Sequence, residues 1–318
     1  MKQYTSLYFV GAGGIGMSAL VRYFLAKGYK VAGYDRTQSP LTTELKTEGL
    51  EIVYEESVES IPDYCRNPET TLVVYTPAIP ASHAGLVYFR EHGFRVVKRA
   101  ELLGLITQSS KGLCFAGTHG KTTTSSMAAH IFHESPIGCN AFLGGILRNY
   151  NSNLILSEQS PFTVIEADEY DRSFHWLHPY MAVVTATDPD HLDIYGTEEA
   201  YLESFARFTS LIQPGGCLIM KKGIKLVPSV KENVKIYTYS ARDGGDFHAG
   251  NIRIGDGTIV FDFVMPEGSV ADIELGVPVE INIENAVAAM AIAWLNGVSG
   301  DDMRRAMASF KGAKRRFE

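Results

Sequence analysis

A glycine-rich segment in the middle of the chain carries the side chains best suited to chemistry. It follows the apolar run Leu113–Ala116 and opens a serine- and alanine-rich segment that predicts a helix. A glycine turn between strand and helix lets backbone N–H groups close around an anion, and the helix N-terminus adds partial positive charge. The pattern predicts a polyphosphate site in which Lys121 neutralises phosphate oxygens and Thr122 binds Mg²⁺. The segment consists of Gly117, Thr118, His119, Gly120, Lys121, Thr122 and Thr123.

The other interpretation of this segment is a glycine turn with a solvated lysine, and its place between strand and helix argues against that. The usual first glycine of the pattern would fall at Phe115, so the loop is the shorter form.

A second glycine loop lies near the N-terminus. Gly11, Gly13 and Gly16 fit the G-x-G-x-x-G spacing, and Asp35 ends the next expected strand, where an acidic residue often meets a ribose. Alone, this loop predicts an NAD-dependent dehydrogenase. The separate polyphosphate loop favours another diphosphate ligand, such as a nucleotide sugar, with the Ser18 hydroxyl at the helix N-terminus. A tight turn without a ligand is the structural alternative.

Four carboxylates follow the strand expected at residues 162–167. They lie at the carboxyl edge of the predicted parallel sheet, where the phosphate loop also lies. Carboxylates can hold Mg²⁺ there, directly or through water. We predict Glu169 as the ligand, with Glu166 and Asp168 holding bound water, and a solvated acidic loop is the alternative. The four are Glu166, Asp168, Glu169 and Asp171.

A histidine among aspartates follows the strand expected at residues 181–186. Asp188, Asp190 and Asp193 surround His191. Because Mg²⁺ prefers oxygen ligands, His191 suits a second metal or a water contact, and a structural role is equally open.

Two asparagines precede the apolar run Ala286–Leu295. The amides of Asn282 and Asn285 offer both donor and acceptor, which suits an adenine edge. Chemistry alone favours Asn282 as the N-cap of the following helix.

Composition narrows the class of protein. A chain of 318 residues predicts two domains, and a net charge of -7 gives no support for nucleic-acid binding. The longest apolar run, Ala286–Leu295, is too short to cross a bilayer, so no membrane partner is expected. The four cysteines are scattered without a C-x-x-C pair, which predicts reduced structural thiols in a cytoplasmic protein.

Alternating strands and helices predict an α/β fold throughout. Residues 1–108 predict a Rossmann-like domain with a parallel sheet, and the polar segment 107–112 predicts the boundary. Residues 109–318 predict a P-loop-type central α/β domain with a small antiparallel β extension at 251–264. Expected strands are 7–10, 30–34, 71–75, 94–97, 113–116, 162–167, 181–186 and 217–220; expected helices are 17–26, 83–92, 122–133, 198–211, 283–295 and 301–309. The basic, glycine-bearing end at 312–318 is typical of a linker, so we expect a further C-terminal domain to be absent from this chain.

Taken in order, these motifs resemble the Mur ligases, the ATP-dependent enzymes that build the peptide stem of peptidoglycan. The resemblance rests on residues 11–20, the phosphate loop, Glu-Ala-Asp-Glu at 166–169, Asp-His-Leu-Asp at 190–193, the two asparagines and Arg-Arg-Phe at 315–317. It covers essentially the whole chain, and the combination is more specific than any one piece.

The resemblance implies a role for each motif. Lys121 would contact ATP phosphates, Thr122 and Glu169 would hold one Mg²⁺, and His191 would mark a second metal site. Catalysis is thereby expected at Lys121, Glu169 and His191. Asn282 and Asn285 would lie near the adenine, and Arg316 would reach toward phosphate. The N-terminal domain would bind the UDP part of the substrate through Gly11, Gly13, Gly14, Ile15, Gly16, Met17, Ser18 and Asp35.

Within the family, the sequence Gly-Gly-Ile-Gly-Met-Ser-Ala-Leu at 13–20 is typical of the alanine-adding members. The implied reaction joins UDP-N-acetylmuramate and L-alanine through an acyl phosphate. Murein tripeptide ligases share the phosphate loop but usually lack the double glycine, and they are the alternative within the family. A non-catalytic UDP-sugar-binding module is the alternative outside it. The oligomeric state does not follow from the sequence.

Three departures from the family pattern stand out. Ile281 occupies a position where the family has histidine, which weakens the adenine assignment. No lysine lies between Lys121 and Lys221, so the carbamylated lysine of some members is not expected. The family's third domain is missing, so we expect this fragment to be inactive alone.

Overall fold

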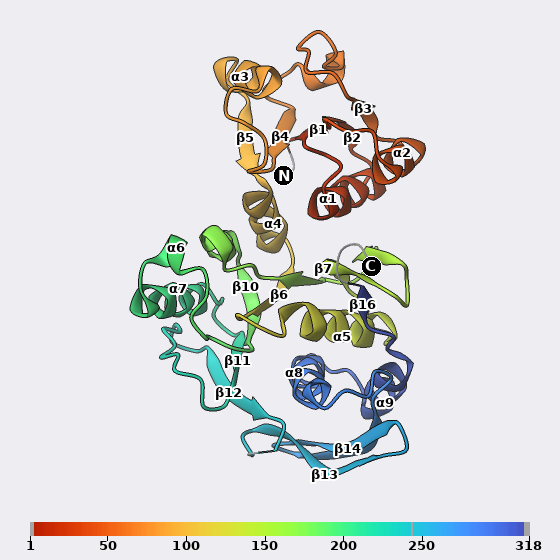
Figure 1. The fold of residues 1–318 in the computed structure, drawn as a ribbon, viewed down its shortest axis with the longest axis vertical. Helices are drawn as coiled ribbons and strands as arrows, with labels where there is room; N and C mark the ends of the chain where they lie inside the picture. The colour runs from red at the N-terminus through yellow and green to blue at the C-terminus, as the bar shows by residue number, and fades with distance from the viewer. Residues whose placement is uncertain (1–2, 243, 315–318) are drawn as a thin grey trace. The chain divides into compact units, whose positions relative to one another are not determined.

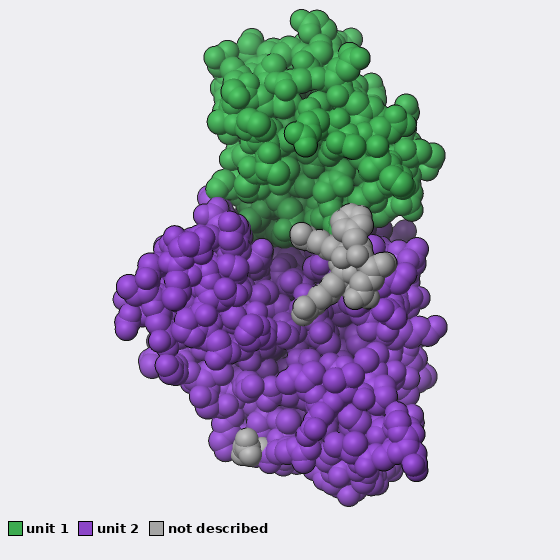
Figure 2. Space-filling model, viewed as in Figure 1, with its two compact units in different colours: residues 1–106 green, residues 107–318 purple. Residues whose placement is uncertain are grey.

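The computed structural model describes residues 3–242 and 244–314. It divides into two compact units, Met1–Ile106 and Thr107–Glu318 (Figures 1 and 2). The boundary falls within helix α4 (Arg99–Gln108), and strand β6 starts at Lys111. The segment 107–112 is therefore mostly helix end and strand start, and only Ser109 and Ser110 lie between them.

Unit 1 is built on a five-stranded parallel sheet in the order β3-β2-β1-β4-β5. All five residues of the central strand β1 are buried, as a strand covered on both faces requires. The chain runs outward from β1 to β3 and then crosses to β4. Open parallel sheets bind ligands where the strand order reverses, which in this sheet is at the carboxyl ends of β1 and β4. The strands are β1 (Ser6–Val10), β2 (Lys30–Tyr34), β3 (Glu51–Val53), β4 (Thr71–Tyr75) and β5 (Arg95–Lys98).

Helices of unit 1 connect these strands. α1 directly follows the glycine loop that ends β1, so the helix N-terminus lies at the carboxyl edge of the sheet. The helices are α1 (Ile15–Ala26), α2 (Pro40–Thr47), α3 (Ala84–Glu91) and α4, with a 3₁₀ turn η1 (Asp63–Cys65).

Unit 2 contains a mixed sheet in the order β15-β14-β13-β12-β11-β10-β6-β9-β7-β16, with β8 beside β7. Strands β12 to β7 of this order are parallel, and β13, β14 and β15 form an antiparallel extension. The predicted α/β class with its antiparallel extension is confirmed. The strands are β6 (Lys111–Ala116), β7 (Asn140–Leu147), β8 (Ser152–Ile155), β9 (Phe162–Glu166), β10 (Pro179–Val184), β11 (Cys217–Lys221), β12 (Lys235–Ser240), β13 (Phe247–Gly255), β14 (Thr258–Met265), β15 (Gly268–Glu274) and β16 (Ala313–Lys314).

Two buried helices form the centre of unit 2. α5 (Lys121–His133) and α8 (Ile281–Leu295) share one hydrophobic core, and α8 and α9 lie between α5 and the β13–β14 hairpin (Figure 1). Alanines along α8 let its neighbours approach closely, which explains why the longest apolar run is a core helix. The remaining helices are α6 (Leu192–Tyr195), α7 (Glu198–Ser210), α9 (Gly300–Ser309) and the 3₁₀ segment η2 (Tyr170–Trp176).

Elements without a strong local pattern escaped the sequence prediction. They include α2, α4 and β7, whose stability comes from packing within the folded units rather than from periodicity. Within residues 3–242 and 244–314, no helix combines the length and apolar character needed to cross a bilayer. All four cysteines lie within the described residues, are buried, and form no disulfide.

Packing in the core of unit 2 predicts how a truncated side chain changes the free energy of unfolding. Phe132 on α5 is fully buried and packs against Phe162, with ring centroids 5.5 Å apart. Phe132→Ala should lower the free energy of unfolding of unit 2 by about 3–5 kcal/mol, because lost burial and the resulting cavity add. Chemical denaturation, monitored through the unfolding of unit 2, measures this change in free energy. Val227→Ala is the control, because Val227 is 80% exposed and its truncation should change the free energy by less than about 0.5 kcal/mol.

Candidate phosphate-binding site

The phosphate loop needs glycine at two positions. Gly117 has φ 140°, and a Cβ there would lie 2.2 Å from the Thr185 hydroxyl oxygen. Gly120 has φ 84° and is the N-cap of α5, with the Asn285 amide oxygen 3.1 Å from an added Cβ. Both conformations are left-handed and disfavour side chains. The loop backbone is therefore pressed against β10 and α8.

The helices that follow the two glycine loops share an open N-terminus. Neither α1 nor α5 has a side chain that caps its first turn. By contrast, α2, α7 and α9 are capped by Ser39, Thr197 and Ser299. First-turn N–H groups have no partner within a helix, so an uncapped N-terminus suits an anion.

Hydrogen bonds of Thr118 hold the phosphate loop in shape. The Thr118 hydroxyl lies 2.7 Å from the Asp188 carbonyl and 2.9 Å from the hydroxyl of Tyr201, a fully buried residue. The Thr118 N–H donates to the Ala186 carbonyl at 3.1 Å. His119 is exposed at the tip of the loop, and Thr123 lies in the first turn of α5. The loop is thus tied to the carboxyl end of β10.

Lys121 points back into this loop. Its ammonium donates to the Gly117 carbonyl at 2.6 Å, and both Glu169 carboxylate oxygens lie 2.8 Å from Nζ. The side chains of Lys121 and Glu169 are only 14% and 2% exposed. Burial raises the pKa of the Glu169 carboxyl, and the lysine charge opposes that rise.

Thr122 meets a different carboxylate. Its hydroxyl donates to Glu166 Oε1 at 3.1 Å, and Glu166 Oε2 accepts from the Gly144 N–H at 3.1 Å. An added Cβ at Gly144 would lie 2.3 Å from the Glu166 carboxylate, so a larger residue there would displace that carboxylate. Burial raises the pKa of Glu166, while the bond from Thr122 and the charge of Lys121 lower it.

The three residues predicted to hold metal, Thr122, Glu169 and His191, have different hydrogen-bond and ion-pair partners. β9 ends at Glu166, so that residue faces Thr122, while Glu169 comes after a turn and reaches Lys121. His191 begins α6 with φ 52° and lies 3.7 Å from the Asp190 carboxylate. Among the described residues, no hydrogen bond or ion pair joins Thr122 to Glu169 or His191. The same part of the chain holds no group of three or more His, Cys, Asp or Glu side chains arranged for a metal.

The two asparagines form a buried network at the start of α8. Asn285 accepts from the Thr124 hydroxyl at 3.2 Å and donates to the Asn282 amide oxygen at 3.1 Å. Asn282 donates to the Val277 carbonyl. The expectation that Asn282 is the N-cap was wrong, because the helix starts earlier and Glu280 is the N-cap. Arg316, predicted to reach phosphate, lies outside the described residues.

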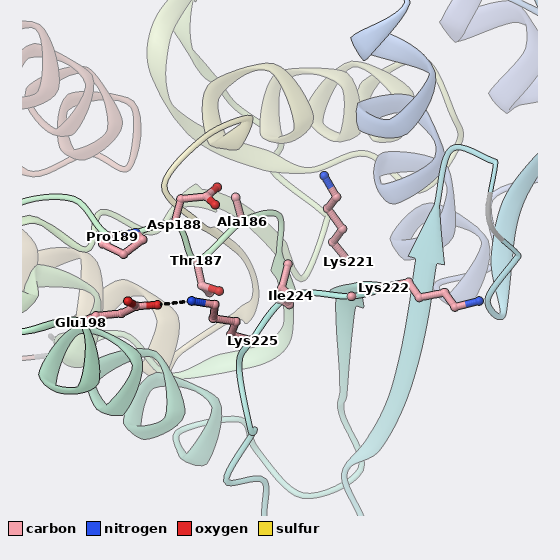
Figure 3. Close-up of a pocket in the computed structure, with 10 residues that line it drawn as sticks. Ala186, Thr187, Asp188, Pro189, Glu198, Lys221, Lys222, Ile224 and Lys225 are labelled. Atoms are coloured by element: carbon pink, nitrogen blue, oxygen red, sulfur yellow. Dashed lines mark hydrogen bonds and ion pairs between the residues drawn. The ribbon is translucent and has the colours of Figure 1, made fainter.

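A pocket of about 310 Å³ adjoins the phosphate loop at the carboxyl ends of β10 and β11 (Figure 3). Ala186 and Asp188, which bond to Thr118, form part of its wall. Lys221 Nζ pairs with Glu284 of α8 at 2.9 Å, and Lys225 Nζ pairs with Glu198 of α7 at 2.7 Å. Figure 3 shows Lys222 pointing away from Asp188. Two of the pocket's lysines are thus paired with carboxylates. The lining is Ala186, Thr187, Asp188, Pro189, Glu198, Lys221, Lys222, Gly223, Ile224 and Lys225.

In unit 1, Asp35 braces the first glycine loop. Its carboxylate accepts from the Gly13 N–H at 2.7 Å and from the Thr37 N–H at 3.1 Å. Gly11 has φ 90°, and an added Cβ there would lie 2.5 Å from the Thr76 methyl. The carboxylate predicted to meet a ligand is therefore engaged with the loop's own backbone.

α1 starts at Ile15, two residues before the expected start at Met17. Met17 and Ser18 are buried, and both N–H groups donate to the Gly14 carbonyl. The Ser18 hydroxyl donates to the Ile15 carbonyl at 2.8 Å. Gly14 has open space around it, and an added Cβ at Gly16 would lie 2.5 Å from Arg99 Nε. The open part of the loop is thus Gly14–Gly16, with a guanidinium beside it.

Several residues at these sites were missed from the sequence. Tyr195, which donates to the Glu169 carbonyl, and Tyr201 come from the α6–α7 region. Arg99 follows β5, and no spacing rule links it to Gly16. The Gly144-Gly145 pair inside an apolar strand was a readable signal, because such glycines often mark a close approach.

Comparisons with known proteins agree with this arrangement. Residues 6–111 match the Mur ligase family catalytic domain, and residues 115–293 match the Mur ligase middle domain. A solved UDP-N-acetylmuramate-alanine ligase from Thermotoga maritima superposes with a TM-score of 0.80 at 24% identity, covering 98% of this chain and 70% of that one. A second solved structure is a UDP-N-acetylmuramate:L-alanyl-gamma-D-glutamyl-meso-diaminopimelate ligase from Neisseria meningitides. It superposes with a TM-score of 0.83 at 22% identity, covering 98% of this chain and 100% of that one. At these identities the two structures support the fold.

Sequence relatives are much closer. The chain is 66% identical over 318 residues to a UDP-N-acetylmuramate--L-alanine ligase from Parabacteroides distasonis, covering all of this chain and 69% of that relative. It is 55% identical to the enzyme of that name from Porphyromonas gingivalis, covering 98% of this chain and 69% of the relative. The predicted family is therefore confirmed. The chain belongs to the Mur ligase family, of which it carries the catalytic and middle domains.

Proposed function

We propose that this chain carries the substrate-binding and ATP-binding parts of a ligase that joins L-alanine to UDP-N-acetylmuramate. One observation carries the proposal. The uncapped N-terminus of α5 brings Lys121 and Thr122 against two carboxylates, Glu169 and Glu166. The relatives that are 66% and 55% identical bear the name of that ligase.

The chemistry explains why such a ligase needs a phosphate site. A carboxylate is a poor electrophile because its negative charge repels nucleophiles. Phosphoryl transfer from ATP gives an acyl phosphate with a good leaving group, and the amine of L-alanine then displaces phosphate. The protein's part is to orient the groups and to offset negative charge. First-turn N–H groups of α5 and the Lys121 ammonium supply that charge.

Magnesium fits the oxygen donors beside Lys121. Thr122 and Glu166 present two oxygen ligands 3.1 Å apart, the kind that Mg²⁺ prefers alongside phosphate and water. When bound there, Mg²⁺ would offset charge on the transferring phosphoryl group. His191 is proposed as a marker of a second metal site on the α6 loop.

The nucleoside is proposed to extend from Gly120 toward α8 and the adjoining pocket. The Asn285 amide oxygen lies 3.1 Å from an added Cβ at Gly120, and Lys221 of the pocket pairs with Glu284 in the first turn of α8. From this position, the amides of Asn282 and Asn285 would contact the adenine. Their amides are also bonded to each other, so they fix the helix start.

The UDP part of the substrate is proposed to bind unit 1. Gly14–Gly16 open α1 at the reversal point of the parallel sheet, which favours a diphosphate. Arg99 adds a full positive charge beside Gly16.

Calorimetric titration tests the proposal, with UDP-N-acetylmuramate, UDP and NADH as separate ligands. We expect heat with the first, weaker binding of UDP, and none with NADH. NADH binding would favour a dehydrogenase, and well-folded protein that gives no heat with UDP-N-acetylmuramate would count against the assignment.

A matched glycine pair localises that binding. Gly16→Ala places a Cβ against the Arg99 guanidinium and should weaken UDP-N-acetylmuramate binding by about tenfold, on the order of 1.4 kcal/mol. Gly255→Ala on β13 of unit 2 is the control, because nothing lies within 4 Å of an added Cβ there and the residue is outside the proposed site. Equal affinity of the two variants in the same titration would exclude the Arg99 contact from the site.

A further inference from the structure

The ammonium of Lys121 already has an anion in the position where a phosphate group is proposed to bind. Both Glu169 oxygens lie 2.8 Å from Nζ, and the Gly117 carbonyl lies 2.6 Å away. A carboxylate that presents two oxygens to one ammonium resembles one face of a phosphate group. The pair is nearly closed to solvent, with the Glu169 side chain 2% exposed.

A buried lysine without a counter-charge is costly, which explains why Lys121 pairs with a carboxylate. Breaking one side of a buried ion pair leaves an uncompensated charge. Glu169 removes that cost while the nucleotide is absent. A triphosphate arriving at the loop offers the same compensation and competes with the carboxylate for Lys121.

The segment after Glu169 is suited to release. Asp171 and Arg172 are consecutive non-glycine residues with φ of 50° and 56°, in the left-handed region. This conformation is strained for residues with a Cβ, and the strain can relax when the segment moves. Contacts with Tyr195 help to hold the segment in place: its hydroxyl donates to the Glu169 carbonyl, and the Arg172 guanidinium stacks 4.8 Å from its ring centroid.

We propose that Glu169 is a positioning residue that occupies the phosphate site by holding Lys121 in the nucleotide-free protein and is displaced by the terminal phosphates of ATP. This inference rests on the proposed nucleotide site and gives Glu169 a role apart from metal binding. The carboxylate lowers the apparent affinity for ATP, because only the fraction of molecules with Lys121 released can bind the terminal phosphates.

Titration of the chain with ATP or AMP, each with and without Mg²⁺, tests the inference on Glu169→Gln and Glu169→Asp. The glutamine variant should bind ATP about tenfold more tightly than the wild type, as expected if a tenth of the molecules or fewer have Lys121 free. The aspartate variant keeps the charge on a shorter side chain and should fall between them. AMP affinity should not change, because AMP lacks the terminal phosphates. General structural damage would weaken the binding of both ligands. Tighter binding of ATP alone therefore separates release of Lys121 from structural damage.

Each outcome decides between the proposals. Tighter ATP binding by the glutamine variant than by the wild type supports the inference. Measurable binding by the variant supports it equally where wild-type binding is too weak to measure. Wild-type binding with equal or weaker binding by both variants overturns the role of Glu169 and leaves the nucleotide site in place. If the variants bind ATP more weakly than the wild type only in the presence of Mg²⁺, Glu169 is assigned to metal binding. Absence of ATP binding by the folded wild type and both variants overturns the nucleotide site and this inference together. If the glutamine variant fails to fold, the aspartate variant decides by the same criteria.

Discussion

Lys121→Ala should abolish ligation, with kcat/KM falling by on the order of 10³ or more. The ammonium is the one side-chain cation bonded within the phosphate loop among the described residues, at 2.6 Å from the Gly117 carbonyl. Removing one preorganised group that stabilises transition-state charge typically costs two to three orders of magnitude. Product formation from UDP-N-acetylmuramate, L-alanine and ATP, measured on the full-length protein, gives the result.

The control must separate lost chemistry from lost folding, because Lys121→Ala leaves Glu169 buried without its partner. Lys121→Ala combined with Glu169→Gln removes both charges and should be as inactive as the single variant while folding more stably. Lys235→Ala, at an exposed position on β12, should keep wild-type activity. Wild-type turnover by either variant that lacks Lys121 would refute its role.

Glu166→Gln should lower kcat/KM by about 10² and raise the Mg²⁺ concentration needed for half-maximal rate. Glutamine keeps the shape and can still accept from the Gly144 N–H, but it loses the charge beside Thr122. A carboxylate at a magnesium site supplies both a ligand and charge neutralisation, and losing such a group typically costs one to two orders of magnitude in metal affinity. Initial rates over a range of Mg²⁺ concentrations measure both effects.

Gly144→Ala provides an independent route to the same site. Its Cβ would lie 2.3 Å from the Glu166 carboxylate and would push that group from Thr122, so the variant should show the same shift in Mg²⁺ requirement. Glu158→Gln, at an exposed loop position, is the charge-matched control. If Glu166→Gln and Gly144→Ala both leave the Mg²⁺ requirement unchanged, Glu166 is not a magnesium ligand.

Local signals in the sequence were sufficient to predict much of the fold. Strands β2 and β4 have the bounds expected, because short apolar runs bounded by polar and glycine residues mark buried strands. The glycine loops and the helices after them were also predictable, since glycine spacing and helix starts depend on neighbouring residues. The burial of Met17 and Ser18 was not predictable in the same way, because the helix starts at Ile15, two residues earlier than expected.

Sequence alone therefore determined the two α/β units, the two glycine loops and the family. The folded chain decided which carboxylate meets which partner. Pairing of β9 with β6 puts Glu166 opposite Phe115, two residues before Gly117, and β7 brings the Gly144 N–H to the same carboxylate. Glu169 lies past a turn and reaches Lys121 instead. These contacts join residues between 22 and 51 positions apart, and strand register, which is set by packing across the whole sheet, brings them together.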